Sequence, residues 1–158
     1  MIKRAIILIH LVFLSNCSFF AHPSDTEMLL RFRSHKTEFV QLLTMLSDDR
    51  EIVRLTDKNV FYSDAFEGNI SNDRFKEYRT LLTKLQLDYG VHRDNASTVR
   101  FIASSKGFPV ASSEKSFVYS TSDLSPLAES LDDLVYKKNQ QQVFRKIEEN
   151  WYLGYESW

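Results

Sequence analysis

The chain contains 158 residues, of which 43% are hydrophobic and 13% aromatic, and its formal net charge is −1. This length and this supply of aromatic side chains suffice for one domain with a dense core, and they exclude a chain that is disordered throughout. The nearly balanced charge lacks the basic surplus that is typical of nucleic-acid-binding proteins, so we expect no nucleic acid as a partner.

The N-terminal segment has the order of a secretory signal. Lys3 and Arg4 form a short basic region, and residues 5–14 (AIILIHLVFL) are apolar apart from one histidine. This run is shorter than the stretch of about 20 residues that a helix needs to cross a bilayer. Residues 1–16 are therefore expected to be a signal peptide, with an uncleaved membrane anchor as an alternative.

The end of this segment, Leu14-Ser15-Asn16-Cys17, resembles the lipobox of bacterial lipoproteins. Leu14 and Ser15 match the positions three and two before the acylated cysteine, whereas Asn16 stands where the pattern has Gly, Ala or Ser. The resemblance implies that Cys17, the only cysteine in the chain, carries a lipid that anchors the protein to a membrane. Ser18 follows Cys17, and the absence of Asp there favours the outer membrane; secretion without a lipid is the alternative.

Residues 17–23 are expected to be a short tether that includes the lipidated cysteine, and residues 24–158 are expected to form a single domain. Ser24 and Glu27 have the spacing of a capping box. Apolar residues then recur at steps of three and four, which predicts an amphipathic helix over residues 25–47.

The next elements are predicted from turn and cap signals. Residues 51–56 and 60–63 read as two strands of a hairpin. Ser71 is expected to cap a second helix, and Gly90 is expected to mark the stop after that helix. Further strands are predicted at 99–104, 116–121, 143–149 and 151–157, with a break at 106–109 and a short helix at 126–134.

This order predicts an α+β fold, in which an N-terminal long helix and a second helix pack on a curved antiparallel sheet of about four to six strands. The element order resembles the cone-shaped nuclear-transport-factor-2-like (NTF2-like) and cystatin-like topologies. A topological likeness of this kind carries no function by itself.

The sequence contains no glycine-rich nucleotide motif and no familiar zinc spacing, so neither a cofactor nor a metal is expected. The pair His35 and Glu38 is interpreted as solvated, as are the adjacent acids 48–49 and 132–133. If the chain is an enzyme, the weak catalytic candidates are His92 and Asp94, in a loop ahead of a strand, together with Tyr119.

The C-terminal aromatic residues are expected to serve two purposes. Trp151, Leu153 and Tyr155 share one face of a strand and are expected in the core. Tyr152 and Trp158 point elsewhere and could form an interaction surface, but packing in the core or at the sheet edge is the favoured interpretation.

Two internal stretches, residues 75–82 and 145–153, resemble small bacterial lipoproteins of uncharacterised function. This resemblance supports export and anchoring and implies no catalytic residue. We therefore expect a membrane-anchored lipoprotein of the cell envelope that binds an envelope protein or a small ligand. The alternatives are a small pocket-bearing enzyme of an NTF2-like kind and an inhibitor-type module.

Overall fold

The computed structural model describes residues 21–108, 111–132, 134 and 141–158. Its helices are α2 (Asp25–Ser34), α3 (Lys36–Asp48) and α4 (Asn72–Lys84). Its strands are β1 (Ile52–Leu55), β2 (Val60–Tyr62), β3 (Val91–Asn95), β4 (Thr98–Phe108), β5 (Ala111–Ser120), β6 (Gln141–Glu148) and β7 (Trp151–Ser157). The predicted signal peptide and Cys17 lie outside the described residues.

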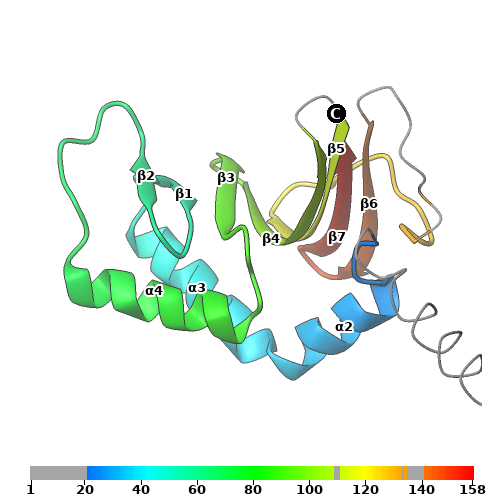
Figure 1. The fold of residues 1–158 in the computed structure, drawn as a ribbon, viewed down its shortest axis with the longest axis horizontal. Coiled ribbons are helices and arrows are strands. Elements are labelled where there is room, and N and C mark those ends of the chain that lie inside the picture. The colour runs from blue at the N-terminus through cyan, green and yellow to red at the C-terminus, as the bar shows by residue number, and fades with distance from the viewer. Residues whose placement is uncertain (1–20, 109–110, 133, 135–140) are drawn as a thin grey trace, which may run out of the picture.

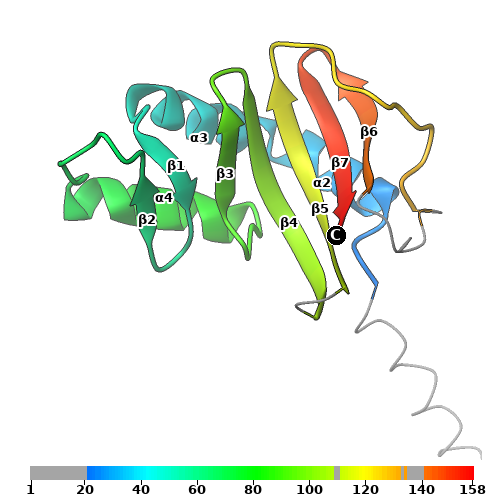
Figure 2. The ribbon, with the colours of Figure 1, turned by 90° about the horizontal axis from the view of Figure 1, so that it is seen from above.

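The strands form one antiparallel sheet in the order β2-β1-β3-β4-β5-β7-β6. The helices gather on one face of this curved sheet, and no described helix lies on the other face (Figures 1 and 2). The predicted α+β fold with helices on a curved antiparallel sheet is therefore confirmed. The sheet has seven strands, however, which is more than the sequence predicted.

The additional strand is β3. Residues 92–94, which were expected in a loop, belong to β3: His92 pairs with both β1 and β4, and Arg93 pairs with β4. The sequence of β3 is VHRDN, in which only Val91 is buried, so the strand lacks the apolar alternation by which a half-buried strand is recognised. Arg93 fixes β3 in place, because its guanidinium donates to the carbonyl oxygens of Ile52 and Leu46.

The long helix that was predicted over residues 25–47 is divided at His35. The capping box at Ser24 and Glu27 is present, as expected. His35 has φ −126°, outside the helical region, and separates α2 from α3. Because of this break, Phe32 on α2 and Phe39 on α3 both reach the curved sheet.

The core lies between the helices and the sheet and is rich in aromatic rings. Phe39 packs against Phe117 with ring centroids 4.7 Å apart, and Phe32 packs against Trp151 at 5.0 Å. Trp151 and Tyr155 belong to this core, as predicted. Tyr152 points to the other face and is buried there, which confirms the favoured interpretation of packing and leaves it outside any exposed interaction surface.

Two local predictions are wrong. In the described part of 126–134 there is no helix, because the backbone around Leu127 pairs with Phe144 on β6 instead. The break predicted at 106–109 does not occur over residues 106–108, where β4 continues to Phe108 and pairs with β5. The predicted hairpin of β1 and β2 and the Ser71 cap of α4 are both confirmed.

Candidate functional site

The face of the sheet opposite the helices carries a group of ionisable side chains that we call the open-face cluster. Its members are His92, Asp94, Arg100, Glu114 and Glu156. His92 lies opposite Arg100 across β3 and β4, and Glu114 lies opposite Glu156 across β5 and β7. Neighbouring residues alternate between faces along a strand, so Arg100 points away from the helix-facing core to which its neighbours Val99 and Phe101 belong.

Arg100 is the centre of this cluster, and its side chain is only 16% exposed. Its Nη2 lies 2.8 Å from Asp94 Oδ1, and its Nη1 lies 3.4 Å from Glu114 Oε1. Nη1 also donates to Glu156. One guanidinium therefore faces three carboxylates, and the cluster carries a surplus of acidic groups.

The two predicted candidates His92 and Asp94 come together in this cluster. His92 Nδ1 lies 2.8 Å from Asp94 Oδ1 and 3.1 Å from Arg100 Nη2. Tyr119 does not join them, because it lies on the helix-facing side of β5, where its ring packs against Trp151. The predicted set of three is therefore divided between the two faces of the sheet.

Glu114 is the member whose protonation is most altered. Burial raises the pKa of Glu114 to about 7, and the nearby charges of Glu156 and Asp94 act in the same direction. Arg100 opposes these effects without cancelling them. A carboxyl group with such a pKa exchanges protons near neutral pH, which is a property of general acids and bases.

A second polar network lies at the start of the domain, and we call it the N-terminal clasp. Its members are His22, Pro23, Asp25, Lys115 and Asp132. The Lys115 ammonium is 2% exposed and lies 2.7 Å from Asp25 Oδ1 and 2.7 Å from Asp132 Oδ1. It also donates to the carbonyl oxygen of Pro23 at 2.9 Å. This buried lysine thus donates two hydrogen bonds and forms an ion pair with Asp25 Oδ1.

Asp25 connects the clasp to the far edge of the sheet. Its Oδ2 accepts from the Leu131 backbone N–H at 2.9 Å and from Arg145 on β6 at 2.8 Å. Burial by itself would raise the pKa of Asp25, but hydrogen bonds from Lys115, Leu131 and Arg145 bring the pKa below its ordinary value. Asp25 therefore remains ionised and balances the cations around it.

His22 lies in the expected tether but is attached to the sheet. Its Nδ1 lies 2.5 Å from Ser104 Oγ on β4, and its Nε2 lies 2.8 Å from Ser113 Oγ on β5. Burial and the charges of Lys115 and Lys106 lower the pKa of His22 to about 4. Such a weak base would activate a serine poorly, so these contacts hold the chain in place rather than form a nucleophile.

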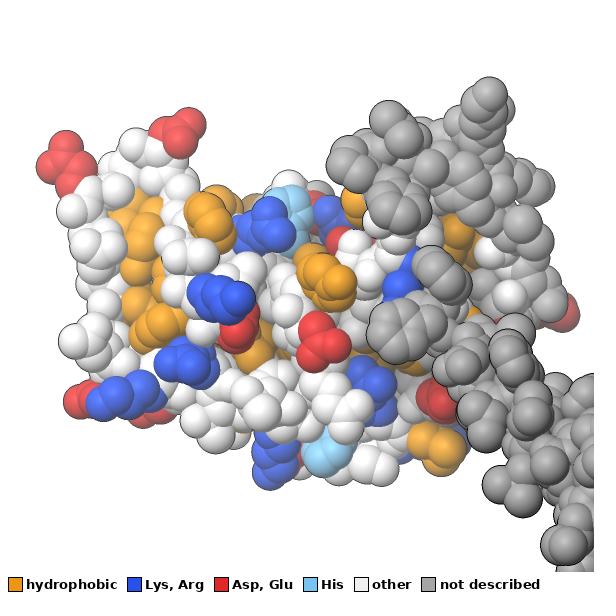
Figure 3. Space-filling view, viewed as in Figure 1, with side chains coloured by type: hydrophobic (Ala, Val, Ile, Leu, Met, Phe, Trp, Pro, Cys, Tyr) orange, Lys and Arg blue, Asp and Glu red, His pale blue; other side chains and the backbone are white. Residues whose placement is uncertain are grey.

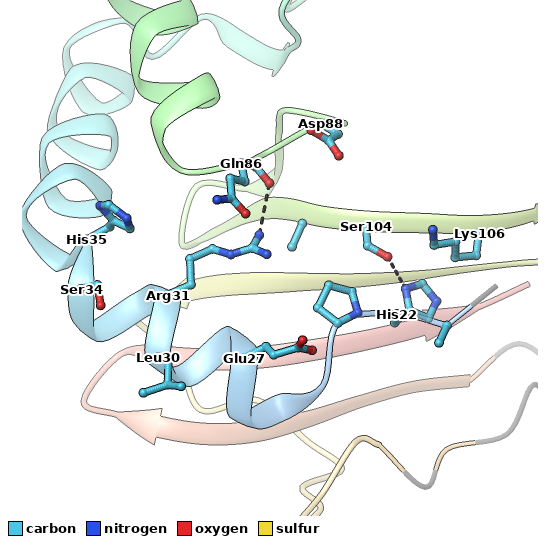
Figure 4. Close-up of a pocket in the computed structure, with 13 residues that line it drawn as sticks. His22, Glu27, Leu30, Arg31, Ser34, His35, Gln86, Asp88, Ser104 and Lys106 are labelled. Carbon is cyan, nitrogen blue, oxygen red and sulfur yellow. Dashed lines mark hydrogen bonds between the residues drawn. The ribbon is translucent and has the colours of Figure 1, made fainter. Parts of the chain in front are cut away.

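Two cavities flank the clasp. The larger one, of about 880 Å³, lies between α2, residues 86–88 and β4 (Figure 4). Arg31 reaches across it and donates to the carbonyl oxygen of Gln86 at 3.2 Å. A second cavity, of about 430 Å³, is lined by residues of β5 and β7 together with Leu131, Asp132 and Leu134. Ala21 and His22 line both cavities, so residues 21–22 separate them.

Acidic residues from the pairs 48–49 and 132–133 form hydrogen bonds within the domain. Asp49 accepts from Arg74 and from Tyr78, and Asp132 bonds Lys115. Glu38 lies 3.8 Å from His35 and 2.6 Å from Lys84. Across the described ranges, no group of three or more potential ligands has the geometry of a metal site. No helix within those same ranges is long and apolar enough to cross a bilayer.

Sequence reasoning missed His22, Arg100, Glu114, Lys115 and Glu156. Only Lys115 had a readable signal, since it continues the alternation of Phe117 and Tyr119 toward the core and is a charged residue there. No protein-family model, curated protein or solved structure matches this chain.

Proposed function

We propose that this protein is a lipoprotein of the bacterial cell envelope, held to the outer membrane through a lipid on Cys17, and that its domain binds an envelope protein or a small ligand. The observation that carries the proposal is the order of features at the N-terminus: a signal-like segment, a lipobox-like motif, and then the clasp.

The clasp supports an anchoring role for the preceding residues. Ala21 lies four residues after Cys17, a separation that an extended chain spans with at most about 14 Å. His22 and Pro23 are already bonded to the sheet. A lipid on Cys17 would therefore hold the domain close to the bilayer surface.

The charge distribution favours a lipid over electrostatic attachment. On the face shown in Figure 3, acidic and basic side chains are interspersed. The basic residues of the first helical segment are also partly engaged, since Lys36 pairs with Glu148 at 2.7 Å and Arg31 bonds Gln86. Interspersed charges give a weak attraction to anionic lipid compared with the clusters of basic residues that bind such membranes.

For the binding role, the larger cavity beside α2 is the best candidate. It combines the cations Arg31 and Lys106 with the acids Glu27 and Asp88. Leu30, at its edge, is 58% exposed, which gives the cavity an apolar contact point. Such a mixture of a few polar groups and an apolar edge suits a peptide or a small amphipathic ligand.

Processing of the precursor tests the anchor. In an expressing Gram-negative host, globomycin should cause the wild-type precursor to accumulate, because it blocks the lipoprotein signal peptidase. Cys17→Ser should give no globomycin-dependent change, and Asn16→Gly should be processed faster than the wild type. Release of a soluble mature chain in the presence of globomycin would contradict the anchor.

Site-specific photo-crosslinking in intact cells tests the binding role. A crosslinker at Leu30 should give a discrete product. A crosslinker at Val40, which is 45% exposed on α3 and does not line the cavity, should give none. Equal products at both positions, or none at Leu30, would remove the cavity as the binding site.

One observation favours a second candidate, a small acid–base enzyme on the open face: the contact of 2.8 Å between His92 and Asp94 beside Glu114. A carboxylate that orients an imidazole is a common arrangement in general bases. Hydrolysis of p-nitrophenyl acetate faster than by an equal concentration of free imidazole, with the excess lost in His92→Gln, would support it. A rate unaffected by this substitution would exclude His92 as the base.

A further inference from the structure

Residues 21–23 form a short strap that lies across the sheet, and a single side chain joins it to both strands beneath. His22 bonds Ser104 on β4 through one ring nitrogen and Ser113 on β5 through the other. The edge of Tyr155 on β7 also packs against the imidazole, with ring centroids 5.9 Å apart. The remaining polar attachment is the bond from Lys115 to the carbonyl oxygen of Pro23.

The surroundings of His22 are unsuited to a positive charge. The positive charges of Lys106 on β4 and Lys115 on β5 both lower the pKa of the imidazole from the sheet side. No carboxylate among the described residues lies within ion-pair distance of it. Asp132 lines the same smaller cavity, but its Oδ1 is bonded to Lys115.

The acidic groups on the helix side offer little to offset a positive charge on His22. Glu27 on α2 lines the larger cavity with His22, but its carboxylate is bonded to Ser24 in the capping box. Arg31 on α2 adds a further cation to that cavity, and Asp88 faces it from the segment between α4 and β3. An imidazolium at this position would be half-buried among cations without an ion-pair partner of its own.

From this geometry we infer that the strap is an acid-sensitive gate: protonation of His22 releases residues 21–23 from the sheet and joins the two cavities into one trough over Ser104 and Ser113. The serine hydroxyls do not decide the outcome, because a hydroxyl accepts from an imidazolium as readily as it donates to a neutral ring. The protonation state of His22 in the docked strap is set by burial and by the two lysines, and both favour the neutral ring.

Release leaves the rest of the clasp intact. Lys115 loses the Pro23 carbonyl but retains Asp25 and Asp132. Ser24 keeps its cap on α2, so the helix still begins at Asp25. The change is therefore confined to residues 21–23 and to the two cavities that they separate.

The gate would have a second consequence, which rests on the proposed lipid on Cys17. With the strap docked, His22 is the first attached position and lies five residues after Cys17, with a reach of at most about 17 Å. With the strap released, the connection extends to Ser24 and its reach grows to about 24 Å. Acidification would then open the trough and let the domain stand farther from the bilayer.

The mobility of a nitroxide label at position 21 tests the gate independently of lipidation. The label is attached to Ala21→Cys in the full chain, in detergent, with Cys17→Ser to leave a single thiol. Electron paramagnetic resonance should show a restricted label at pH 7.5 and a growing mobile fraction between pH 6.5 and 4, while circular dichroism stays unchanged.

Three variants make this test specific. His22→Gln keeps a donor and an acceptor without titrating, so its label should remain restricted over the whole range. Lys106→Met removes a flanking cation, so the midpoint of release should move to lower pH. His92→Gln, a histidine on the opposite face of the sheet, should behave like the wild type.

Three results would overturn the inference: a label that is restricted at every pH, a release that persists in His22→Gln, or a mobile fraction that rises only together with global unfolding. None of them bears on lipidation, which processing of the precursor measures separately.

Discussion

Lys115 and Arg100 lie on the neighbouring strands β5 and β4, and each is a cation held by carboxylates, yet their surroundings differ. Lys115 faces the helices, is 2% exposed, and shares its network with Asp25, Asp132 and Arg145, so that two cations meet two acids. Arg100 faces the open side, is 16% exposed, and meets three acids with no second cation in hydrogen-bonding contact among the described residues.

The same pairing of cations with carboxylates can therefore serve two purposes. A buried network whose charges balance holds segments together, and removing one partner leaves a buried charge unpaired. A partly exposed network with surplus acid adjusts its protonation instead, as the raised pKa of Glu114 shows. We therefore assign the ionic part of the clasp, Lys115 with Asp25 and Asp132, to structure, and the open-face cluster to response.

Removal of Lys115 should have the largest effect on the free energy of unfolding. Lys115→Met leaves the buried Asp25 without its closest cation and should lower the free energy of unfolding by about 3–5 kcal/mol, measured by urea denaturation. The double variant Lys115→Met with Asp25→Asn should recover part of this loss. A loss below about 1 kcal/mol for Lys115→Met would show that the clasp does not hold the domain together.

Substitution of Glu114 should raise the free energy of unfolding at neutral to basic pH, by an amount smaller than the loss expected for Lys115→Met. Its folded pKa of about 7 lies above the ordinary 4.5, so its contribution to stability is present below pH 4.5 and is lost as the pH rises through 7. Glu114→Gln should therefore match the wild type near pH 4 and be more stable at pH 8, by on the order of 2 kcal/mol.

Denaturation curves at several pH values measure this difference. Glu149→Gln, at an exposed glutamate in the turn between β6 and β7, is the matched control and should show no such pH dependence. A Glu114→Gln variant that is less stable than the wild type at pH 8 would mean that Glu114 is a fixed ion-pair partner of Arg100, like the acids around Lys115.

The smallest effect is expected at His92. Its side chain is 40% exposed, and its pairing with Asp94 is accessible to solvent. His92→Gln should change the free energy of unfolding by no more than about 0.5 kcal/mol, because exposed ion pairs contribute little. A loss above about 1.5 kcal/mol in urea denaturation would place His92 in the structural class together with the clasp.

The sequence predicted those parts of the fold that depend on local signals. Ser24 and Ser71 marked the starts of two helices, and the alternation in residues 151–155 identified Trp151 and Tyr155 as core. The break at His35 escaped prediction because the apolar pattern continues through it. The break lets Phe32 and Phe39 pack in one core against the sheet, which is a tertiary relation.

The sites were less predictable, for two physical reasons. His92 and Asp94 are two residues apart on one strand, so sequence could pair them, but Glu114 and Glu156 join them only through the strand order. The clasp depends on contacts across about a hundred residues, such as Pro23 with Lys115. A lysine on a strand is ordinarily interpreted as exposed, so the alternation that places Lys115 with Phe117 and Tyr119 becomes convincing only once its carboxylate partners are known.

Intact mass spectrometry of the protein from the membrane fraction of a Gram-negative host tests directly whether Cys17 carries a lipid. We expect a mature chain that begins at Cys17 and carries the added mass of a diacylglyceryl group and an acyl chain. A soluble chain without lipid, cut at another position, would contradict it and would make this a freely secreted domain.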